Sequence, residues 1–597
     1  MGIKNIHPHV GIDYTAKRRV RSVVTENNAA TMFAPFVSNR GPENVAYKVY
    51  NNSEFISNYG QLEFSEQGQV VLNIGNWLNA GGAVLAYRMT KSPLTTLVDN
   101  VEGKCLLKED GKYYVVINGL LTSIDIAKDT VTNQSTRFKV ELDTDTEDDI
   151  SYVTIKKDGN NVDAMVDYKK LELSDIRLAT AYGYHANTYT ETSGEGENAS
   201  TTTKDDVTIK AFARAKYSGT FYKDINIRVT QTGIGSCKIE VLKNGTLIES
   251  YSGRTRNNYQ VALESSDYIG ELVISDAYFD SIEDKTDTNW RNSPESLSIR
   301  LKYCKDDINT SILVNETSIG DAIKNGLKDK LSVKCDFILD AGYKQEIKNK
   351  IIDLLIKEDE NARVRDDIIF IADSYELYPK ENVIPAEVTL NNITDSSHET
   401  RLLALYTQYL TTEDIYSITS GREVYVTPTY FLAGLIPYNE RIYGVHYPHA
   451  GKRRGVIADA LSLSENPLPS TKDQLYDERK NYIEKDSTSI QFMSQSTYQQ
   501  EDTALRFLNN SRSLNVIMRE VERIGRTYLH EMNTVTSLNN LNAAITTYLN
   551  DWVQNRALSK CEVIVEADKW DDTLVHIILN IRFSGTIEII SVEINID

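Results

Sequence analysis

The chain has 597 residues, 41% of them hydrophobic and 25% charged, and its formal net charge is −20 at pH 7. This length exceeds what one hydrophobic core organises, so three to five domains of a soluble globular protein are expected. The net negative charge argues against nucleic-acid binding by the chain as a whole. No apolar run approaches the roughly 18 residues of a membrane span. The N-terminus lacks the apolar stretch of a secretion signal, which predicts synthesis in the cytoplasm.

Residues 1–25 are predicted to form an N-terminal arm. Val10, Ile12 and Tyr14 alternate along the chain as in a β-strand, and a basic cluster from Lys17 to Arg21 follows them. A short apolar strand of this kind needs a pairing partner, which the arm itself does not contain.

Residues 26–92 are predicted to form a compact α/β segment. A buried strand is expected over Thr31–Val37, followed by a helix over Ser53–Tyr59 with Ser53 as its N-cap. A second helix leads to Gly81-Gly82, where the chain turns into the strand Ala83–Arg88. That strand is apolar on both faces, which indicates a position inside a sheet.

Two β-rich insertion domains are expected next, an outer one over 93–205 and a second over 206–310. Short alternating stretches such as Phe138–Leu142 are separated by polar turns, which is typical of small β-domains. The Ser-, Thr- and Gly-rich run Thr190–Asp206 is interpreted as a loop between the two.

Residues 311–575 return to an α/β pattern. Cys335–Leu339 and Asp367–Ala372 are predicted to be buried strands, and Gln345–Lys357 the helix between them. This βαβ unit is expected in the same sheet as the strands of 26–92. The predicted fold class is therefore an α/β (α+β) platform built from N- and C-terminal segments, with β-rich insertion domains and extended terminal arm strands.

The clearest predicted helix covers residues 512–530 and carries a basic stripe. Leu514, Ile517 and Val521 belong to its apolar side, and the opposite side holds the arginines Arg512, Arg519, Arg523 and Arg526. Four arginines on one ridge of an acidic protein favour an acidic partner surface. An ordinary solvated face, paired with local glutamates, is the alternative. The loop Lys452-Arg453-Arg454 is a second basic candidate.

Residues 576–597 are predicted to form a C-terminal arm strand. Its apolar residues alternate with polar ones, except for one slip at Ile589-Ile590 that suggests a bulge, and they comprise Ile587, Ile589, Ile590, Val592, Ile594 and Ile596. Such a strand favours addition to a neighbouring subunit, and so does the N-terminal strand at Val10, Ile12 and Tyr14. Closure of both strands within a single chain is equally open.

Catalytic, metal and cofactor chemistry are not predicted. His446 and His449 lie in a Tyr/Pro/Gly loop with no third ligand at useful spacing. Asp366, Asp367 and Asp373 flank a buried strand, where acids more often cap or solvate the chain ends than catalyse. The five cysteines are scattered without a CxxC pair, which favours buried free thiols.

Several short motifs, in this order, resemble those of contractile phage tail sheath proteins. They are Phe36-Val37, Arg40-Gly41-Pro42, Glu54-Phe55, Tyr59-Gly60, Gly81-Gly82, Tyr87-Arg88, the turn Ala215–Phe221 with Asp224-Ile225, Val426-Thr427-Pro428, Ala433-Gly434, Asn481-Tyr482-Ile483 and Arg506–Ile524. The order, the spacing and the interruption by a β-insertion carry the resemblance over about half of the chain. Leu505 departs from the pattern, because the family often has Trp there.

The resemblance implies a structural protein rather than an enzyme. Sheath subunits form stacked rings in a helical sheath around a tail tube protein, meet baseplate and tail terminator proteins, and contract to drive tube penetration and genome ejection. It implies that the four arginines face the tube, that the terminal arms join neighbouring subunits, and that the protein is assembled in the host cytoplasm into the virion tail. A virion adhesin or carbohydrate-binding tail protein is the alternative, and a hydrolase within an insertion a third class.

Overall fold

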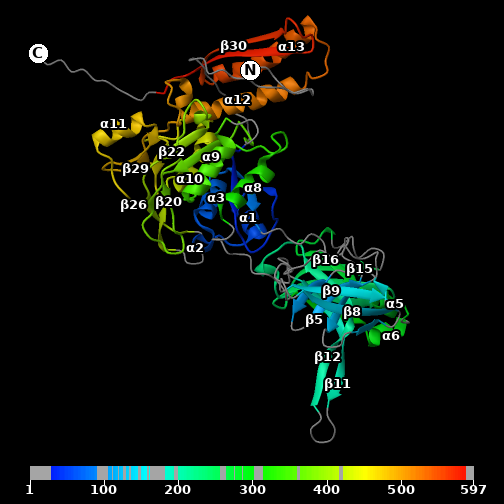
Figure 1. The fold of residues 1–597 in the computed structure, drawn as a ribbon. Coiled ribbons are helices and arrows are strands. Elements are labelled where there is room, and N and C mark those ends of the chain that lie inside the picture. The colour runs from blue at the N-terminus through cyan, green and yellow to red at the C-terminus, as the bar shows by residue number, and fades with distance from the viewer. Residues whose placement is uncertain are drawn as a thin grey trace, which may run out of the picture. The chain divides into compact units, whose positions relative to one another are not determined.

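The computed structural model describes residues 29–90, 105–301, 314–358, 363–415 and 421–586, with gaps inside the second range of which the longest is 162–181. They form two compact units (Figure 1). Unit 1 takes the described residues of Met1–Val37, Asn44–Met89 and Thr310–Asp597, and unit 2 takes those of Ser38–Glu43 and Thr90–Asn309. Both predicted arm strands, at Val10–Tyr14 and Ile587–Ile596, lie outside the described residues.

Unit 1 is built on a seven-stranded sheet with the order β2-β3-β1-β18-β19-β22-β27. The strands are β1 Thr31–Phe36, β2 Ala46–Val49, β3 Ala83–Arg88, β18 Phe337–Leu339, β19 Ile369–Asp373, β22 Leu403–Tyr406 and β27 Lys480–Asn481. Only β2 runs antiparallel to its neighbour, and β1, β3, β18, β19 and β22 are buried throughout, as parallel strands covered on both faces must be.

The N- and C-terminal parts of the chain share this sheet. Phe33 of β1 pairs in parallel with Ile338 of β18, so the expectation that the two regions belong to one sheet is confirmed. The strand Ala83–Arg88 has its predicted bounds and lies between β1 and β2. The chain is thus mixed α/β, as expected.

Helices cover the sheet of unit 1. They are α1 Asn52–Tyr59, α2 Phe64–Gln67, α3 Gln69–Asn79, α8 Glu316–Leu327, α9 Gln345–Leu355 and α10 Thr429–Tyr443. The N-cap of α1 is Asn51, whose side chain accepts a hydrogen bond from the backbone N–H of Glu54, so the expected cap at Ser53 is wrong by two residues. At the end of α3, a Cβ on Gly82 would lie 2.2 Å from Nε1 of the buried Trp77, which is why glycine is needed there.

Smaller sheets and a helix complete the middle of unit 1. They are the pair β20 Tyr375–Glu376 and β21 Ala386–Glu387, the sheet of β23 Leu410–Glu413, β24 Glu423–Val426 and β26 Ala460–Leu463, the sheet of β25 Val456–Ile457, β28 Ile483–Lys485 and β29 Ile490–Phe492, and α11 Pro469–Asp477.

The C-terminal part of unit 1 is a helix pair with a hairpin. It comprises α12 Leu508–Arg526, α13 Val535–Gln554, β30 Leu558–Ala567 and β31 Val575–Phe583 (Figure 1). Ile517, Ile545 and Trp552 form the centre of a shared core, which also includes Leu505. The predicted helix 512–530 therefore exists but begins and ends four residues earlier.

Unit 2 is β-rich. Its strands are β4 Cys105–Glu109, β5 Lys112–Ile117, β6 Leu120–Asp125, β7 Thr130–Asn133, β8 Thr136–Asp145, β9 Ile150–Lys157, β10 Asn160–Asn161, β11 Tyr182–Ser193, β12 Ser200–Ala215, β13 Ile225–Gly233, β14 Ser236–Lys243, β15 Thr246–Arg254, β16 Ile269–Ile274 and β17 Ser296–Arg300, with helices α5 Asp276–Glu283 and α6 Asp287–Asn292. β11 and β12 pair from Tyr182↔Arg214 to Ser193↔Ser200 as a long hairpin (Figure 1). The interpretation of Thr190–Asp206 as a loop is wrong at 190–193 and 200–206, which belong to these strands, because a Thr-rich sequence suits a pleated ladder; residues 194–199 lie outside the described part of the chain.

The segment Ser38–Glu43 joins unit 2 although β1 and β2 flank it in sequence. The Gly41 N–H donates to the Tyr222 hydroxyl at 3.1 Å, and the Ser218 N–H donates to Oε2 of Glu43 at 3.1 Å. The guanidinium of Arg40 lies 4.3 Å from the ring centre of Phe221. Two motifs far apart in sequence, at Arg40-Gly41-Pro42 and Ala215–Phe221, thus meet in one contact.

Candidate functional site

The first two arginines of α12 are anchored inside unit 1. The side chain of Arg512 is 3% exposed, and its guanidinium binds Oδ1 of Asp336 at 3.0 Å and Oε1 of Glu440 at 2.9 Å. Asp336 directly precedes β18, and Glu440 belongs to α10. Arg512 therefore connects α12 to a strand and a helix that lie far from it in sequence.

Arg519 extends the same contact to the next strand. Its Nε donates to Oδ2 of Asp367 at 2.6 Å, and its other nitrogens donate to Oδ1 of Asp336 and to the carbonyl oxygen of Cys335. Asp367 precedes β19 and also accepts a bidentate pair of bonds from Arg365, both at 2.8 Å. We call Asp336, Asp367, Glu440, Arg512 and Arg519 the amino-end cluster, because α12 here crosses the amino ends of two parallel strands.

Electrostatics keep the strand-end acids ionised. Burial raises the pKa of Asp336, but the charges of Arg512 and Arg519 outweigh burial and hold that pKa well below its usual range. For Asp367, burial is likewise outweighed by Arg519 and Arg365, so its pKa is also lowered. Burial raises the pKa of Glu440 despite the neighbouring Arg512. The cluster is thus a set of buried charges that depend on one another.

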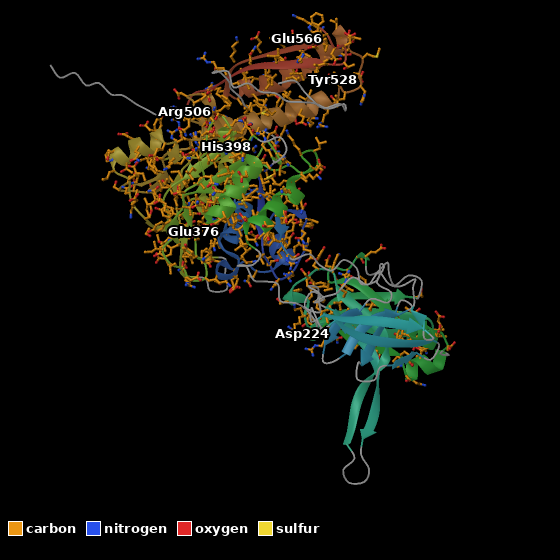
Figure 2. The ribbon with its side chains drawn as sticks, viewed as in Figure 1. Asp224, Glu376, His398, Arg506, Tyr528 and Glu566 are labelled. Carbon is orange, nitrogen blue, oxygen red and sulfur yellow. The ribbon has the colours of Figure 1, made fainter. Side chains whose placement is uncertain are left out.

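The last two arginines of α12 differ from the first two. Arg523 is 66% exposed and binds Glu520 on its own helix, with Nε to Oε2 at 2.8 Å. Arg526 binds Oε1 of Glu522 at 2.8 Å. The prediction of one solvent-facing ridge is therefore corrected for Arg512 and Arg519, whereas Arg523 and Arg526 do reach the surface. Figure 2 marks the two ends of this helix with Arg506 before it and Tyr528 after it.

The sequence offered a weak signal for the missed partners. Asp336 and Asp367 each stand at the start of a run that the pattern identified as a buried strand, where an ionised carboxyl needs positive charge beside it. They lie 176 and 152 residues from the arginines that bind them. A helical wheel shows which residues share a side of α12, but it does not show which side meets another element.

A second polar cluster lies at the carboxyl ends of the same strands. Nζ of Lys348 binds Oδ2 of Asp340 at 2.6 Å, and the Thr429 hydroxyl donates to Oδ2 of Asp373 at 2.6 Å. Burial, reinforced by the charge of Asp340, raises the pKa of Asp373 to about 7. We call Asp340, Lys348, Asp373 and Thr429 the carboxyl-end cluster. It holds two acids for one lysine, so one carboxyl favours its protonated form.

The β30–β31 hairpin is a two-stranded sheet within the described part of the chain. The two strands pair with each other from Leu558↔Phe583 to Ala567↔Val575, and no other described strand joins their sheet. Leu558, Ile581 and Phe583 pack into the core formed with α13. The carbonyl oxygen of Val563 in β30 accepts a hydrogen bond from Nδ2 of Asn542 in α13 at 3.0 Å, so α13 occupies part of that strand's backbone, while no third strand among the described residues pairs with the hairpin.

Neither candidate for metal or catalytic chemistry gains support. Burial and the charge of Arg454 lower the pKa of His446 to about 4, and burial with the charge of Arg512 lowers that of His449 to about 3. Asp367 is bound to two arginines. Across the described residues, no group of three His, Cys, Asp or Glu side chains is placed to hold a metal ion. In the same residues, no helix is both long and apolar enough to cross a membrane.

Comparison with known proteins gives a structural likeness without a sequence match. No family model matches the sequence, and no curated protein matches it. The sheath tail protein Lin1278 from Listeria innocua is similar in structure with a TM-score of 0.50 at 10% sequence identity, over 93% of this chain and 90% of that one.

Two other solved structures are more distant. The sheath tail protein DSY3957 from Desulfitobacterium hafniense has a TM-score of 0.42 at 10% identity, over 96% of this chain and all of that one. The helical sheath of the anti-feeding prophage in its contracted state has a TM-score of 0.37 at 12% identity, over 63% of this chain and 90% of that one. On the likeness to Lin1278, the chain has the fold of a tail sheath protein.

Proposed function

We propose that this chain is a structural sheath subunit that polymerises into a helical, contractile sheath around a tail tube and drives tube penetration and genome ejection on contraction. The supporting observation is the likeness to a sheath tail protein over nearly the whole of both chains, insertions included. The mechanism is mechanical, and neither a cofactor nor a catalytic residue takes part in it.

Subunits would be joined by strand addition at the β30–β31 hairpin. Val10, Ile12 and Tyr14 of one arm, and Ile587, Ile589, Val592, Ile594 and Ile596 of the other, have the alternation that an added strand requires. No third strand among the described residues pairs with the hairpin, so a strand from a neighbouring subunit could add to it. Each backbone hydrogen bond would contribute about 1 kcal/mol, so several would hold a subunit while its units move.

The amino-end cluster would transmit load from these strands to the rest of the subunit. The hairpin packs on α13, α13 shares a core with α12, and α12 is held to β18 and β19 through buried ion pairs. A pull on the hairpin therefore reaches the seven-stranded sheet through side chains that are costly to separate.

Contact with the tube is assigned to the exposed end of α12. Arg523 and Arg526 keep the role that the resemblance implied for all four arginines, because Arg512 and Arg519 are bound within the chain. Exposed ion pairs contribute about 0–1 kcal/mol each, which suits a contact that must release during contraction. The further partners would be baseplate and tail terminator proteins, within a virion tail assembled in the host cytoplasm.

Self-assembly of the purified chain tests this function. We expect tubes in negative-stain microscopy, and deletion of Glu588–Asp597 should give a folded monomer that does not polymerise. The matched control is Glu588→Gln with Glu593→Gln, which keeps the apolar alternation and should still polymerise. Discrete particles that bind cells or glycans would support an adhesin instead.

A further inference from the structure

A group of exposed aromatic and arginine side chains gathers at the C-terminal end of α10. We call Tyr438, Arg441, Ile442, Tyr443, Tyr447 and Arg454 the Tyr/Arg patch. Its tyrosines and isoleucine are between 37% and 53% exposed. Tyr438 and Ile442 are one helical turn apart, and the rings of Tyr443 and Tyr447 are 5.9 Å apart between centres, so the apolar groups are contiguous.

The arginines of the patch are held in place by these rings. The guanidinium of Arg454 lies 5.7 Å from the ring centre of Tyr443 and 5.0 Å from that of Tyr447, and its Nε donates to the carbonyl oxygen of Pro448 at 3.0 Å. The guanidinium of Arg441 lies 5.9 Å from the ring of Tyr438. Stacking fixes the direction of both charges before any partner arrives.

These charges lack acidic partners in the described part of the chain. No described carboxylate lies within ion-pair distance of Arg441, Arg454 or the neighbouring exposed Arg453. The nearby acids are engaged elsewhere, since Glu440 binds Arg512 and Asp486 binds Lys452. The patch is thus a local positive surface on a chain with 85 acidic and 65 basic residues.

We propose that the Tyr/Arg patch docks a second copy of this chain through an acidic surface of that copy. Tyrosine and arginine, together with tryptophan, are enriched among the residues that carry most of the binding energy at protein interfaces. The chain's excess of 20 negative charges makes its own surface electrostatically complementary to the patch. The proposal rests on the proposed function and adds to it a copy-to-copy contact separate from the terminal arms.

Tube-free polymerisation of the full chain tests the docking. The double variant Arg441→Glu with Arg454→Glu should raise the critical concentration for polymerisation at least tenfold, measured by sedimentation. The matched control, Lys324→Glu with Lys328→Glu, reverses two exposed charges at the end of α8, elsewhere in unit 1, and should leave that concentration unchanged. Circular dichroism and thermal melting confirm that each variant is folded.

A photo-crosslinker at position 443 gives a second measurement that does not depend on a destabilising change. In polymers of a chain that is otherwise wild type, the crosslinker should join two copies. The peptide of the second copy to which it is linked should be rich in Asp or Glu. Crosslinks only within one chain, or an unchanged critical concentration for the Arg441/Arg454 variant, would overturn the proposal. The proposal would also be overturned if the Arg441/Arg454 variant formed normal polymers without tubes and failed only to assemble on tubes. If the wild-type chain itself stays monomeric, the proposed function fails first.

Discussion

The two ends of the parallel sheet in unit 1 carry polar clusters of opposite character. At the amino ends of β18 and β19, Arg512 and Arg519 hold Asp336 and Asp367 ionised. At the carboxyl ends of the same strands, Lys348 is the one cation, among the described residues, beside the two buried acids there. The strands and their burial are the same, so the difference arises from the helices that cross each end.

This comparison shows that burial alone does not decide the charge of a carboxyl. Asp336 and Asp373 are both fully buried, yet the pKa of the first is lowered and that of the second is raised to about 7. The deciding factor is whether enough positive charge is present to offset desolvation. The amino-end cluster is therefore expected to act as a fixed joint, and the carboxyl-end cluster to respond to pH.

The largest expected effect is that of Arg512→Ala. The substitution leaves Asp336 and Glu440 buried with less positive charge, so the free energy of unfolding of unit 1 should fall by about 3–5 kcal/mol. Urea unfolding of unpolymerised protein, followed by tryptophan fluorescence, measures the loss. The matched control is Arg523→Ala on the same helix, and equal effects of the two variants would contradict a division of α12 into anchored and exposed arginines.

An intermediate effect is expected from pH. The folded pKa of Asp373 is raised to about 7, so the folded state holds a proton that the unfolded state loses near pH 4, and stability should decrease as pH rises from about 4 to 7. Asp336 and Asp367 have lowered folded pKa values, so their contribution is present above about pH 4 and is lost as pH falls further.

Melting temperature against pH checks these two signs. In Asp373→Asn, the free energy of unfolding should fall less between about pH 4 and 7 than it does in the wild type, by an amount on the order of 1–3 kcal/mol. The loss of stability below about pH 4 should remain. Asp336→Asn should instead reduce the loss of stability that occurs below about pH 4. If Asp373→Asn leaves the profile unchanged, the carboxyl-end cluster does not hold a titrating proton.

The smallest effect on stability is expected at the exposed end of α12. Arg523→Ala and Arg526→Ala should each change the free energy of unfolding by less than about 1 kcal/mol. The glutamate reversals at the same two positions should abolish co-sedimentation with tail tubes and spare tube-free polymers. Unchanged loading on tubes would place the tube contact elsewhere.

The sequence predicted local elements better than it predicted their partners. Strand Ala83–Arg88 has an unbroken apolar run that ends at glycines on one side, and its bounds were predicted correctly. The helix at 512–530 was recognised from its apolar spacing, but its ends depend on packing that spacing does not report. The residues that bind Arg512 and Arg519 come from strands and a helix elsewhere in the chain, and one sequence does not show which distant elements meet.

Two further differences have physical causes of the same kind. The β11–β12 hairpin was missed because its Ser- and Thr-rich composition is shared by loops, whereas the ladder depends on cross-strand register. The N-cap at Asn51 was missed because Ser53 is also a good cap by residue type, and the backbone geometry decides between them. The arm strands, the domain boundaries and the tube contact stay predictions.

The segment Ser38–Glu43 has a consequence for engineering this chain. A designer who wished to exchange unit 2 for another module would cut near residues 90 and 309, where the long insertion begins and ends. The six-residue loop Ser38–Glu43 would stay behind and lose two contacts. These are the contact of the Arg40 guanidinium with the Phe221 ring and the hydrogen bond from the Ser218 N–H to the Glu43 carboxylate. A successful graft must therefore bring its own β1–β2 loop with it, because this module is encoded in two separate pieces of the gene.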